Sequence, residues 1–324
     1  MRVAVVGSGP AGCAAAIALC RAGAHVTLIG DGRDSVGEQL HPAARPLLAR
    51  LGLACLTGQL DCVGVRAAWR SAEPHEQNFL SHPFGNGWLL DRARFGQTLR
   101  HAAAAAGAVL REPARLLGLA RAAAAPHGWR LALSDGEHAC DWLVDATGRR
   151  GAVARLLGVK RRRFDRQVAL VGWLVADHPD DVDATLTVET TSSGWWYGCR
   201  LPGQRRVAGF VTASRPDPSA WEARLRATRH LGPLVDGYLV ERAPVVCAAD
   251  SSLLERCFGP GWIAIGDAAA SYDPLAARGL VAALSSGIEA AALVGAPEAR
   301  LAGWQAAVEA RFATYRAERA RLYA

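Results

Sequence analysis

The stretch Gly7-Ser8-Gly9-Pro10-Ala11-Gly12 decides the fold of this chain. An apolar segment, Arg2–Val6, precedes it, an Ala-rich segment runs through residues 11–22, and a second apolar segment follows at His25–Ile29. This pattern predicts a strand, a helix and a second strand in βαβ order. In such a unit the first glycine allows the tight turn, the second lets the backbone approach a pyrophosphate, and the third lets the helix pack closely on the strand.

The same stretch is predicted to hold phosphates. The N-terminus of the helix offers N–H groups and the positive end of the helix dipole to an anionic ligand. We expect all six residues to line this site, and a bulky side chain at Gly9 to block the pyrophosphate and to force an unfavourable backbone angle. An acidic residue usually ends the second strand and binds the ribose. Gly30 stands there, and we expect the next residue, Asp31, to take that role.

Two further motifs follow predicted strands later in the chain. Gly266-Asp267 comes directly after the apolar residues 261–265, and the sequence continues through Asp273 and Pro274 to Gly279, where Ala-rich helical sequence begins. The segment Val144-Asp145-Ala146-Thr147-Gly148 follows an apolar strand in the middle of the chain.

On these motifs the sequence resembles the FAD-binding hydroxylase superfamily, which includes aromatic hydroxylases, flavin-dependent halogenases and geranylgeranyl reductases. The resemblance implies non-covalently bound FAD as the cofactor. It also implies that Asp267 binds the ribityl chain, that residues 274–279 lie beside the isoalloxazine, and that the helix opened by Gly279 points its N-terminus at the flavin. Thr147 and Gly148 would lie under the FAD, and Arg45 and Arg92 stand where arginines of the family approach it.

Other segments resemble one branch of this superfamily. They are Gly37-Glu38-Gln39-Leu40-His41-Pro42, Trp88-Leu89-Leu90-Asp91-Arg92 and Gly194-Trp195-Trp196-Tyr197. The branch includes halogenase-like flavoproteins that hydroxylate peptidyl tryptophan during the maturation of quinone cofactors. The resemblance covers about residues 1–320.

The predicted fold class is α/β, with a Rossmann-like FAD-binding domain, an inserted antiparallel sheet and C-terminal helices. Residues 1–160 and 245–324 are assigned to the FAD-binding domain, and residues 161–244 to a β-rich substrate domain. Within the latter we expect strands at residues 167–176, 184–191, 194–201 and 206–212, with a turn at Pro202-Gly203. Residues 45–51 and 92–106 are expected to be helical.

The resemblance implies a monooxygenase that hydroxylates an aromatic substrate, such as an indole or a peptidyl tryptophan, through a flavin C4a-hydroperoxide. Halogenation is disfavoured because the only lysine, Lys160, stands in an Arg-rich run, and the halogenase motif Trp-x-Trp-x-Ile-Pro is missing. Two alternatives stay open. One is an FAD-dependent reductase or dehydrogenase of the geranylgeranyl-reductase type, and the other is a non-catalytic FAD-binding partner.

Several residues are candidates for catalysis. His41 is placed to assist proton transfer near neutral pH, with a structural histidine as the alternative. Trp195 and Tyr197, with Trp196 between them, are expected to form an aromatic wall for a flat substrate, although one of the two tryptophans is equally well explained as core. Asp273 and Pro274 are expected to border the reacting end of the flavin. Arg45 and Arg92 are alternatively surface residues.

The electron source is left open by the middle motif. Hydroxylases that take NADH or NADPH directly usually carry Asp-Gly at its centre, whereas this chain has Thr147-Gly148. The candidates are NADH, NADPH or a separate flavin reductase.

Composition excludes other classes. The chain has 324 residues, 51% of them hydrophobic, and no apolar stretch of membrane-spanning length. Neither a signal peptide nor a zinc-like cysteine cluster is evident, so we expect a cytoplasmic protein without a metal site. The net charge of +7 favours anionic ligands. The run Lys160-Arg161-Arg162-Arg163 is interpreted as a solvated surface turn and not as a nucleic-acid site.

Overall fold

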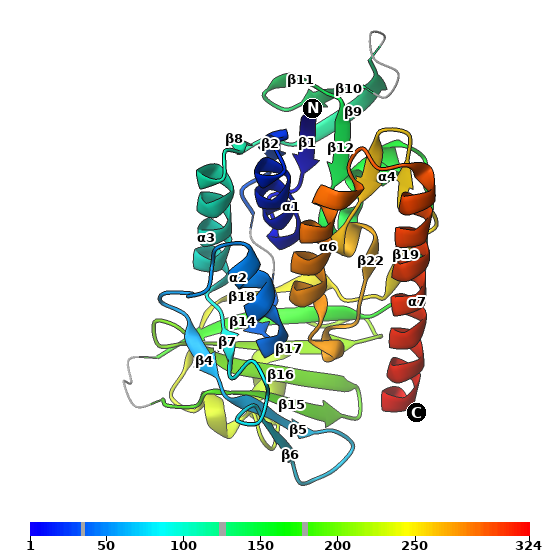
Figure 1. The fold of residues 1–324 in the computed structure, drawn as a ribbon. Coiled ribbons are helices and arrows are strands. Elements are labelled where there is room, and N and C mark those ends of the chain that lie inside the picture. Colours follow the sequence, from blue (N-terminus) through cyan, green and yellow to red (C-terminus); the bar gives the residue numbers. More distant parts are fainter. Residues whose placement is uncertain (34–35, 123–127, 177–180) are drawn as a thin grey trace.

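The computed structural model describes residues 1–33, 36–122, 128–176 and 181–324. The predicted βαβ unit is present as β1 (Arg2–Val6), α1 (Pro10–Arg21) and β2 (His25–Ile29). These strands belong to a six-stranded sheet of order β20-β21-β12-β1-β2-β8 (Figure 1). The chain is thus an α/β protein, as predicted.

The three sequence motifs meet at one edge of this sheet. β1 pairs in parallel with β12 (Trp142–Asp145), and β12 pairs in parallel with β21 (Trp262–Ala264). Each motif directly follows one of these strands. Because the carboxyl ends of adjacent parallel strands lie side by side, the motifs converge on one crevice, which is where open α/β sheets bind ligands.

A second, seven-stranded sheet lies below the first in Figure 1 and has the order β18-β14-β17-β16-β15-β5-β6. The four strands predicted in this region are present within one or two residues of their expected ends. Three further strands, β5, β6 and β18, were not predicted, and β5 and β6 lie outside residues 161–244. The strands are β5 (Gly64–Ala68), β6 (His75–Asn78), β14 (Val168–Val175), β15 (Thr185–Thr191), β16 (Gly194–Leu201), β17 (Arg205–Thr212) and β18 (Leu239–Ala248). The predicted domain boundaries stay a prediction.

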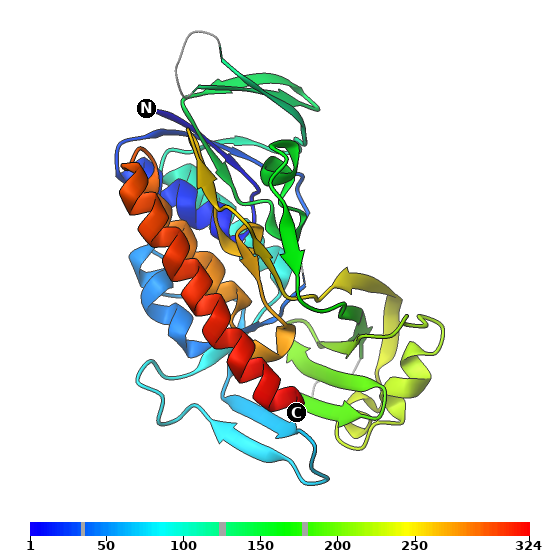
Figure 2. The same cartoon turned by 90° about the vertical axis from the view of Figure 1, so that its right-hand side faces the viewer.

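Helices cover the first sheet and connect it to the second. The predicted helices are present as α2 (Arg45–Arg50) and α3 (Arg92–Ala105), and the C-terminal helical region consists of α6 (Gly279–Leu293) and α7 (Glu298–Tyr323). α1 and α6 pack so closely that a Cβ at Gly287 would lie 2.4 Å from the carbonyl oxygen of Ala11. α7 runs from the first sheet down to the second (Figures 1 and 2).

The remaining elements are short. They are β3 (Gln39–Leu40), β4 (Leu60–Cys62), β7 (Gly87–Leu89), β8 (Val109–Arg111), β9 (Leu116–Arg121), β10 (Trp129–Leu133), β11 (Gly136–Cys140), α4 (Ala152–Leu156), β13 (Arg161–Arg163), α5 (Trp221–Arg226), β19 (Ser252–Leu254), β20 (Phe258–Gly259) and β22 (Ala270–Ser271), with 3-10 turns at Pro42–Ala44, Gly148–Arg150, Pro233–Val235, Gly266–Ala268 and Pro274–Ala276.

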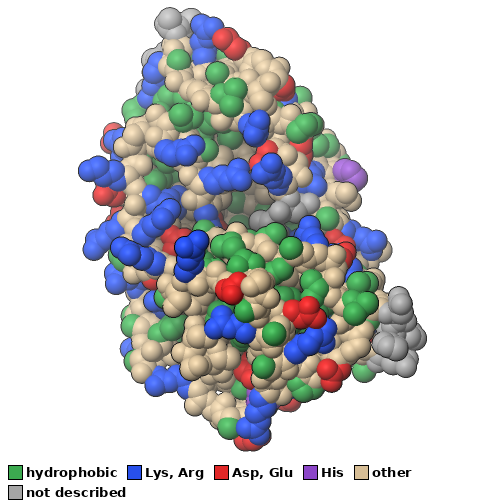
Figure 3. Space-filling model, turned by 180° about the vertical axis from the view of Figure 1, so that it is seen from behind, with side chains coloured by type: hydrophobic (Ala, Val, Ile, Leu, Met, Phe, Trp, Pro, Cys, Tyr) green, Lys and Arg blue, Asp and Glu red, His purple; other side chains and the backbone are tan. Residues whose placement is uncertain are grey.

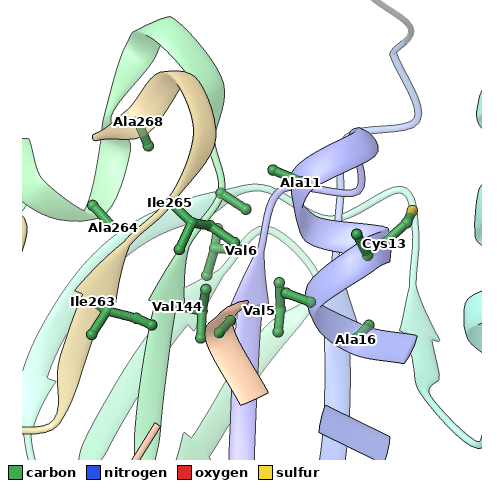
Figure 4. Close-up of a cluster of buried hydrophobic side chains, with 14 of the residues drawn as sticks. Val5, Val6, Ala11, Cys13, Ala16, Val144, Ile263, Ala264, Ile265 and Ala268 are labelled. Atoms are coloured by element: carbon green, nitrogen blue, oxygen red, sulfur yellow. The ribbon is translucent and has the colours of Figure 1, made fainter. Parts of the chain in front are cut away.

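The core beneath the motifs is built from β-branched and small side chains. Val5, Val144 and Ile263 on the three motif-bearing strands are buried together with Ala11 and Ala16 of α1 (Figure 4). Small residues on α1 let it approach the sheet, and branched residues fill the pleats. None of the described helices is long and apolar enough to cross a membrane.

Candidate functional site

The phosphate loop fits a bound pyrophosphate. Gly7 has a φ of +113°, which favours glycine, and a Cβ there would lie 2.1 Å from the carbonyl oxygen of Ala146. A Cβ at Gly12 would lie 1.7 Å from the carbonyl oxygen of Gly7, so both residues must be glycine for packing reasons. At Gly9, in contrast, a Cβ meets no atom within 4 Å. This open space, above an α1 N-terminus that no side chain caps, is what an anionic ligand requires.

One detail of the expected role of Gly9 is wrong. Its backbone is extended, with a φ of −75° and a ψ of −176°, and any residue can adopt this conformation. A larger side chain at Gly9 would therefore cause no backbone strain. It would only occupy the space over the helix N-terminus.

Steric crowding explains why Gly30 replaces the usual acidic residue. A Cβ at Gly30 would lie 1.9 Å from the Oγ of Ser8, a buried residue of the phosphate loop. Asp31 follows at the end of the crevice. Its Oδ2 lies 3.4 Å from the guanidinium of Arg150, and its Oδ1 accepts a hydrogen bond from the N–H of Arg33. Asp31 thus remains the candidate ribose ligand, which stays a prediction.

The middle motif is organised by Asp145, which is fully buried. Its Oδ1 accepts hydrogen bonds from the N–H and the hydroxyl of Thr147, at 3.0 and 2.6 Å, and its Oδ2 accepts one from the N–H of Ala154. Burial raises the pKa of Asp145, and these hydrogen bonds oppose that shift. Gly148 follows with a φ of +65° and open space where a Cβ would be. Thr147 and Gly148 therefore form a fixed turn beside the phosphate loop.

Asp267 lies in the crevice with two arginines around it. Its Oδ2 is 3.6 Å from the Nε of Arg149, and Arg161 donates to the carbonyl oxygen of Asp267 at 3.1 Å. Burial raises the pKa of Asp267, and the positive charges of Arg149 and Arg161 lower it. Among the described residues no hydrogen-bond donor to its carboxylate is found besides this ion pair. A carboxylate so placed can accept hydrogen bonds from the hydroxyl groups of a ribityl chain.

The interpretation of the basic residues 160–163 as a surface turn is wrong. Arg161–Arg163 form the strand β13, which pairs with β19. The guanidinium of Arg161 is partly buried and also donates to the Oγ of Ser252 at 3.0 Å and to the carbonyl oxygen of Ala268. The sequence analysis missed this role, because alternation in a three-residue strand gives no recognisable pattern.

The segment expected to face the isoalloxazine links Asp267 to α6. Asp273 is buried, and its carboxylate accepts hydrogen bonds from Leu275, Arg319 and Tyr323. Pro274 begins a 3-10 turn, and Gly279 is the first residue of α6. No side chain caps this helix, and a Cβ at Gly279 would meet no atom within 4 Å. The N-terminus of α6 is thus open to a ligand.

His41 lies in a cluster of rings near this segment. Its ring centroid is 5.3 Å from that of Phe79 and 5.2 Å from that of His82, both edge-on. Its Nδ1 accepts a hydrogen bond from the N–H of Ala43, so the neutral ring carries its proton on Nε2. Burial, followed by the charges of His82 and Arg278, lowers the pKa of His41 and keeps the imidazole neutral at pH 7.

The two predicted arginines are anchored by the protein. Arg45 donates from Nε to the carbonyl oxygen of Asn86 at 2.7 Å and lies over the ring of Trp88 at 4.0 Å. Arg92, at the start of α3, lies 5.5 Å from the centroid of Phe95. Contact of either residue with FAD stays a prediction.

The aromatic strand β16 divides between two faces of the sheet. Trp195 is buried in the cluster that also contains Tyr197, Trp69 and Leu275. Trp196 points to the opposite face, where it packs against Phe210 and Trp221 in a separate core. The alternation of the strand explains this division. Trp196 is therefore a core residue, whereas Trp195 and Tyr197 face the segment expected to adjoin the flavin.

Glu38 is a further buried carboxyl group to which the sequence analysis gave no role. Its side chain is 3% exposed, its Oε2 accepts a hydrogen bond from the N–H of Gly37, and its Oε1 has no hydrogen-bond partner within the described structure. Burial raises the pKa of Glu38, and the charge of Arg92 only partly opposes this effect. Its charged form is therefore costly in the folded protein.

We expect Glu38→Gln to raise the melting temperature at pH 8, because a group whose pKa is raised by folding loses stability as the pH rises. The unfolded pKa of a glutamate is about 4.3. The gain should be roughly 2–4 °C at pH 8 and should vanish toward pH 4. Thermal unfolding of both proteins with saturating FAD tests this, with the exposed Glu137→Gln as the control. An equal gain at both pH values would contradict the assignment.

The surroundings of the crevice are basic. Basic side chains, coloured blue in Figure 3 and nearly all of them arginine, gather where the two halves of the molecule meet. Among the described residues no group of three or more His, Cys, Asp or Glu side chains could hold a metal ion. The open α1 N-terminus, the free space at Gly9 and the partly unsatisfied carboxylate of Asp267 fit a dinucleotide that carries a sugar-alcohol chain, such as FAD.

Comparison with known proteins identifies the family to which this chain belongs. The model of the FAD binding domain family, FAD_binding_3, matches residues 1–324, and the chain belongs to this family. It is an FAD-dependent oxidoreductase whose relatives include a tryptophan 2-halogenase and a peptidyl tryptophan dihydroxylase, which confirms the resemblance seen in the sequence.

Two relatives and one solved structure show how similar this chain is to known proteins. LodB of Marinomonas mediterranea, named as an FAD-dependent oxidoreductase, is 27% identical over 304 residues, covering 87% of this chain and 81% of LodB. The menaquinone reductase of Mycobacterium tuberculosis is 31% identical over 322 residues, covering 90% of this chain and 76% of the reductase. The solved structure of the peptidyl tryptophan dihydroxylase QhpG has a TM-score of 0.76 and 27% identity, covering 94% of this chain and 69% of QhpG.

Proposed function

We propose that this chain is an FAD-dependent monooxygenase that hydroxylates an aromatic group, such as an indole or a peptidyl tryptophan. The observation that carries the proposal is the apolar cluster in which Leu275 packs with Trp195, Tyr197 and Trp69. Leu275 belongs to the segment expected to adjoin the isoalloxazine, so the aromatic face of the sheet lies next to that segment. Flat aromatic groups stack favourably on such a face.

The side chains of this region suit oxygen transfer to an aromatic ring. FAD, when bound and reduced, would supply the two electrons that activate dioxygen, of which one oxygen atom enters the substrate and the other leaves as water. Burial raises the pKa of Tyr197, so its phenol stays neutral. His41 is neutral as well and carries its remaining proton on Nε2, where it can donate to a substrate oxygen. Buried apolar side chains around these groups exclude water, which protects a reactive oxidant.

Halogenation is not supported by these residues. The resemblance assigns the halogenases a lysine near the substrate, and Lys160 is the only lysine of this chain. It is exposed, it directly precedes β13, and its carbonyl oxygen accepts a hydrogen bond from the N–H of Glu255. The aromatic cluster belongs to the seven-stranded sheet, which does not include β13.

Reduction of a double bond is the second candidate, because the menaquinone reductase is 31% identical to this chain. Product analysis separates the two functions. The FAD-loaded protein is reduced, exposed to isotopically labelled dioxygen, and incubated with indoles, tryptophan-containing peptides or a menaquinone analogue. We expect one labelled oxygen atom in an indole product. A quinone product that gains two hydrogen atoms, with no label in any indole, would overturn the proposal in favour of the reductase.

The electron source is a separate prediction. We expect slow reduction by NADH or NADPH alone and faster reduction when a flavin reductase is added, because Thr147-Gly148 replaces Asp-Gly in the middle motif. Bleaching of the oxidised flavin band in a stopped-flow instrument measures both rates, with and without an aromatic substrate. Reduction by a nicotinamide alone at about 1 per second or faster would show that this chain draws its electrons directly.

A further inference from the structure

We propose that Arg319 and Tyr323, in the last two turns of α7, are positioning residues that fix the segment of residues 273–278 beside the flavin and tie it to the aromatic sheet. The inference rests on FAD binding and not on the reaction that follows. The first observation that supports this proposal is that hydrogen-bond donors surround the carboxylate of Asp273. Its Oδ2 accepts hydrogen bonds from Arg319 Nε at 2.9 Å and from the Tyr323 hydroxyl at 2.8 Å. Its Oδ1 accepts one from the N–H of Leu275 at 2.8 Å.

α7 holds the same segment at two further points. The backbone N–H of Asp273 donates to the hydroxyl oxygen of Tyr315 at 2.8 Å. Arg278, at the other end of the segment, forms an ion pair with Glu318 at 3.1 Å. Three consecutive turns of one helix therefore contact both ends of the segment. Asp273 is 2% exposed, so water does not compete for its hydrogen bonds, and charge-assisted bonds of this kind are strong.

The hydroxyl of Tyr323 joins this segment to the substrate sheet. It donates to Asp273 and accepts from Trp195 Nε1 at 2.9 Å and from Gln167 Nε2 at 3.1 Å. A phenol has one proton and two acceptor sites, so all of them are used. The ring of Tyr323 also lies edge-on to Trp69, with centroids 5.5 Å apart. One side chain thus connects the segment with two residues of the aromatic cluster.

The backbone of the segment shows why it needs such support. Ala277 has a φ of +48° and a ψ of +20°, a left-handed conformation that is unfavourable for a residue other than glycine. Such a conformation persists only where the surroundings determine it. Ala277 directly precedes the N-cap of α6, whose open N-terminus is expected to face the flavin. Fixing both ends of the segment therefore fixes the orientation of that helix end.

The test compares FAD with ADP, since ADP lacks the ribityl chain and the isoalloxazine and is expected to contact the phosphate loop and Asp31 but not this segment. Tyr323→Phe keeps the ring against Trp69 and removes only the hydroxyl. Arg319→Met removes the charge, and Arg319→Lys restores it without the planar guanidinium. Arg321→Met, an exposed arginine in the same turn, is the matched control. The measurements are the dissociation constants of FAD and ADP and the visible circular dichroism of the bound flavin.

We expect Tyr323→Phe and Arg319→Met each to weaken FAD about tenfold and to change the flavin spectrum, while ADP binding stays within twofold of wild type. Arg319→Lys should recover part of the loss, and Arg321→Met should change nothing. Equal losses of FAD and ADP would show a general structural role and overturn the proposal. Unchanged FAD affinity and spectrum in both variants would overturn it as well. Either result leaves the question of oxygen transfer untouched, because neither measurement involves a substrate.

Discussion

Gly9→Val is expected to abolish FAD binding while the protein stays folded. A Cβ at this position meets no protein atom within 4 Å, and the backbone of Gly9 is extended, so the valine fits the empty protein without strain. The same side chain occupies the space over the α1 N-terminus in which the pyrophosphate is expected. We expect the dissociation constant of FAD to rise at least ~100-fold, or roughly 2.7 kcal/mol. Equilibrium dialysis with FAD and with ADP measures this loss, which both ligands should share.

Gly12→Val is the matched comparison. A Cβ at Gly12 would lie 1.7 Å from the carbonyl oxygen of Gly7, so α1 cannot stay packed on β1. This variant should unfold, whereas the melting temperature of Gly9→Val without FAD should equal that of the wild type. If Gly9→Val binds FAD normally, or if it unfolds as Gly12→Val does, the phosphate loop is misassigned.

Asp267→Ala is expected to weaken FAD by about 1–3 kcal/mol, the usual range for leaving a polar partner unpaired in a buried site. The carboxylate has spare acceptor capacity beside its ion pair with Arg149, and the ribityl hydroxyls are its expected partners. Arg149 keeps its hydrogen bond to the carbonyl oxygen of Tyr272 in the variant, so we expect little loss of stability.

ADP again provides the control for this variant, because it has no ribityl chain. We expect Asp267→Ala to leave ADP affinity unchanged, in contrast to Gly9→Val. Asp217→Ala, which removes an exposed aspartate, controls for the loss of a negative charge in the basic protein. A parallel loss of ADP and FAD would mean that Asp267 acts on the phosphate loop and not on the ribityl chain.

The parts of the fold that follow from local sequence were predictable. β1, α1 and β2 were expected because a glycine-rich turn separates two apolar segments, and the strands β14 to β17 because their sequences are rich in β-branched and aromatic residues. β5 and β6 escaped prediction, since β5 joins the sheet by pairing with β15, more than a hundred positions away, and β6 belongs to the sheet only through its pairing with β5. Short polar strands such as His75–Asn78 carry no hydrophobic alternation, and only the neighbouring strand makes them part of a sheet.

The residues of the candidate site also divide into those that local sequence predicts and those that it does not. Gly9 and Asp267 were predicted from motifs, because backbone geometry near a dinucleotide limits which residues fit. The reason for Gly30 was visible only in three dimensions, where Ser8 fills the space of a Cβ. The contacts of Arg161 and Tyr323 were missed because each joins segments distant in the chain. Neither an arginine in a three-residue strand nor a tyrosine at the end of a C-terminal helix has a distinguishing sequence pattern.

Measuring the FAD bound to the purified protein tests the central claim, non-covalent FAD binding, most directly. The purified chain, loaded with FAD and freed of excess, should be yellow, carry one FAD per chain, and release all of it on heat or acid denaturation. The motifs at Gly7–Gly12 and Gly266-Asp267 predict this result, since they are expected to bind FAD through hydrogen bonds and a helix dipole alone. Failure to bind FAD after reconstitution would contradict the central claim, and flavin that stays attached to the denatured chain would contradict non-covalent binding.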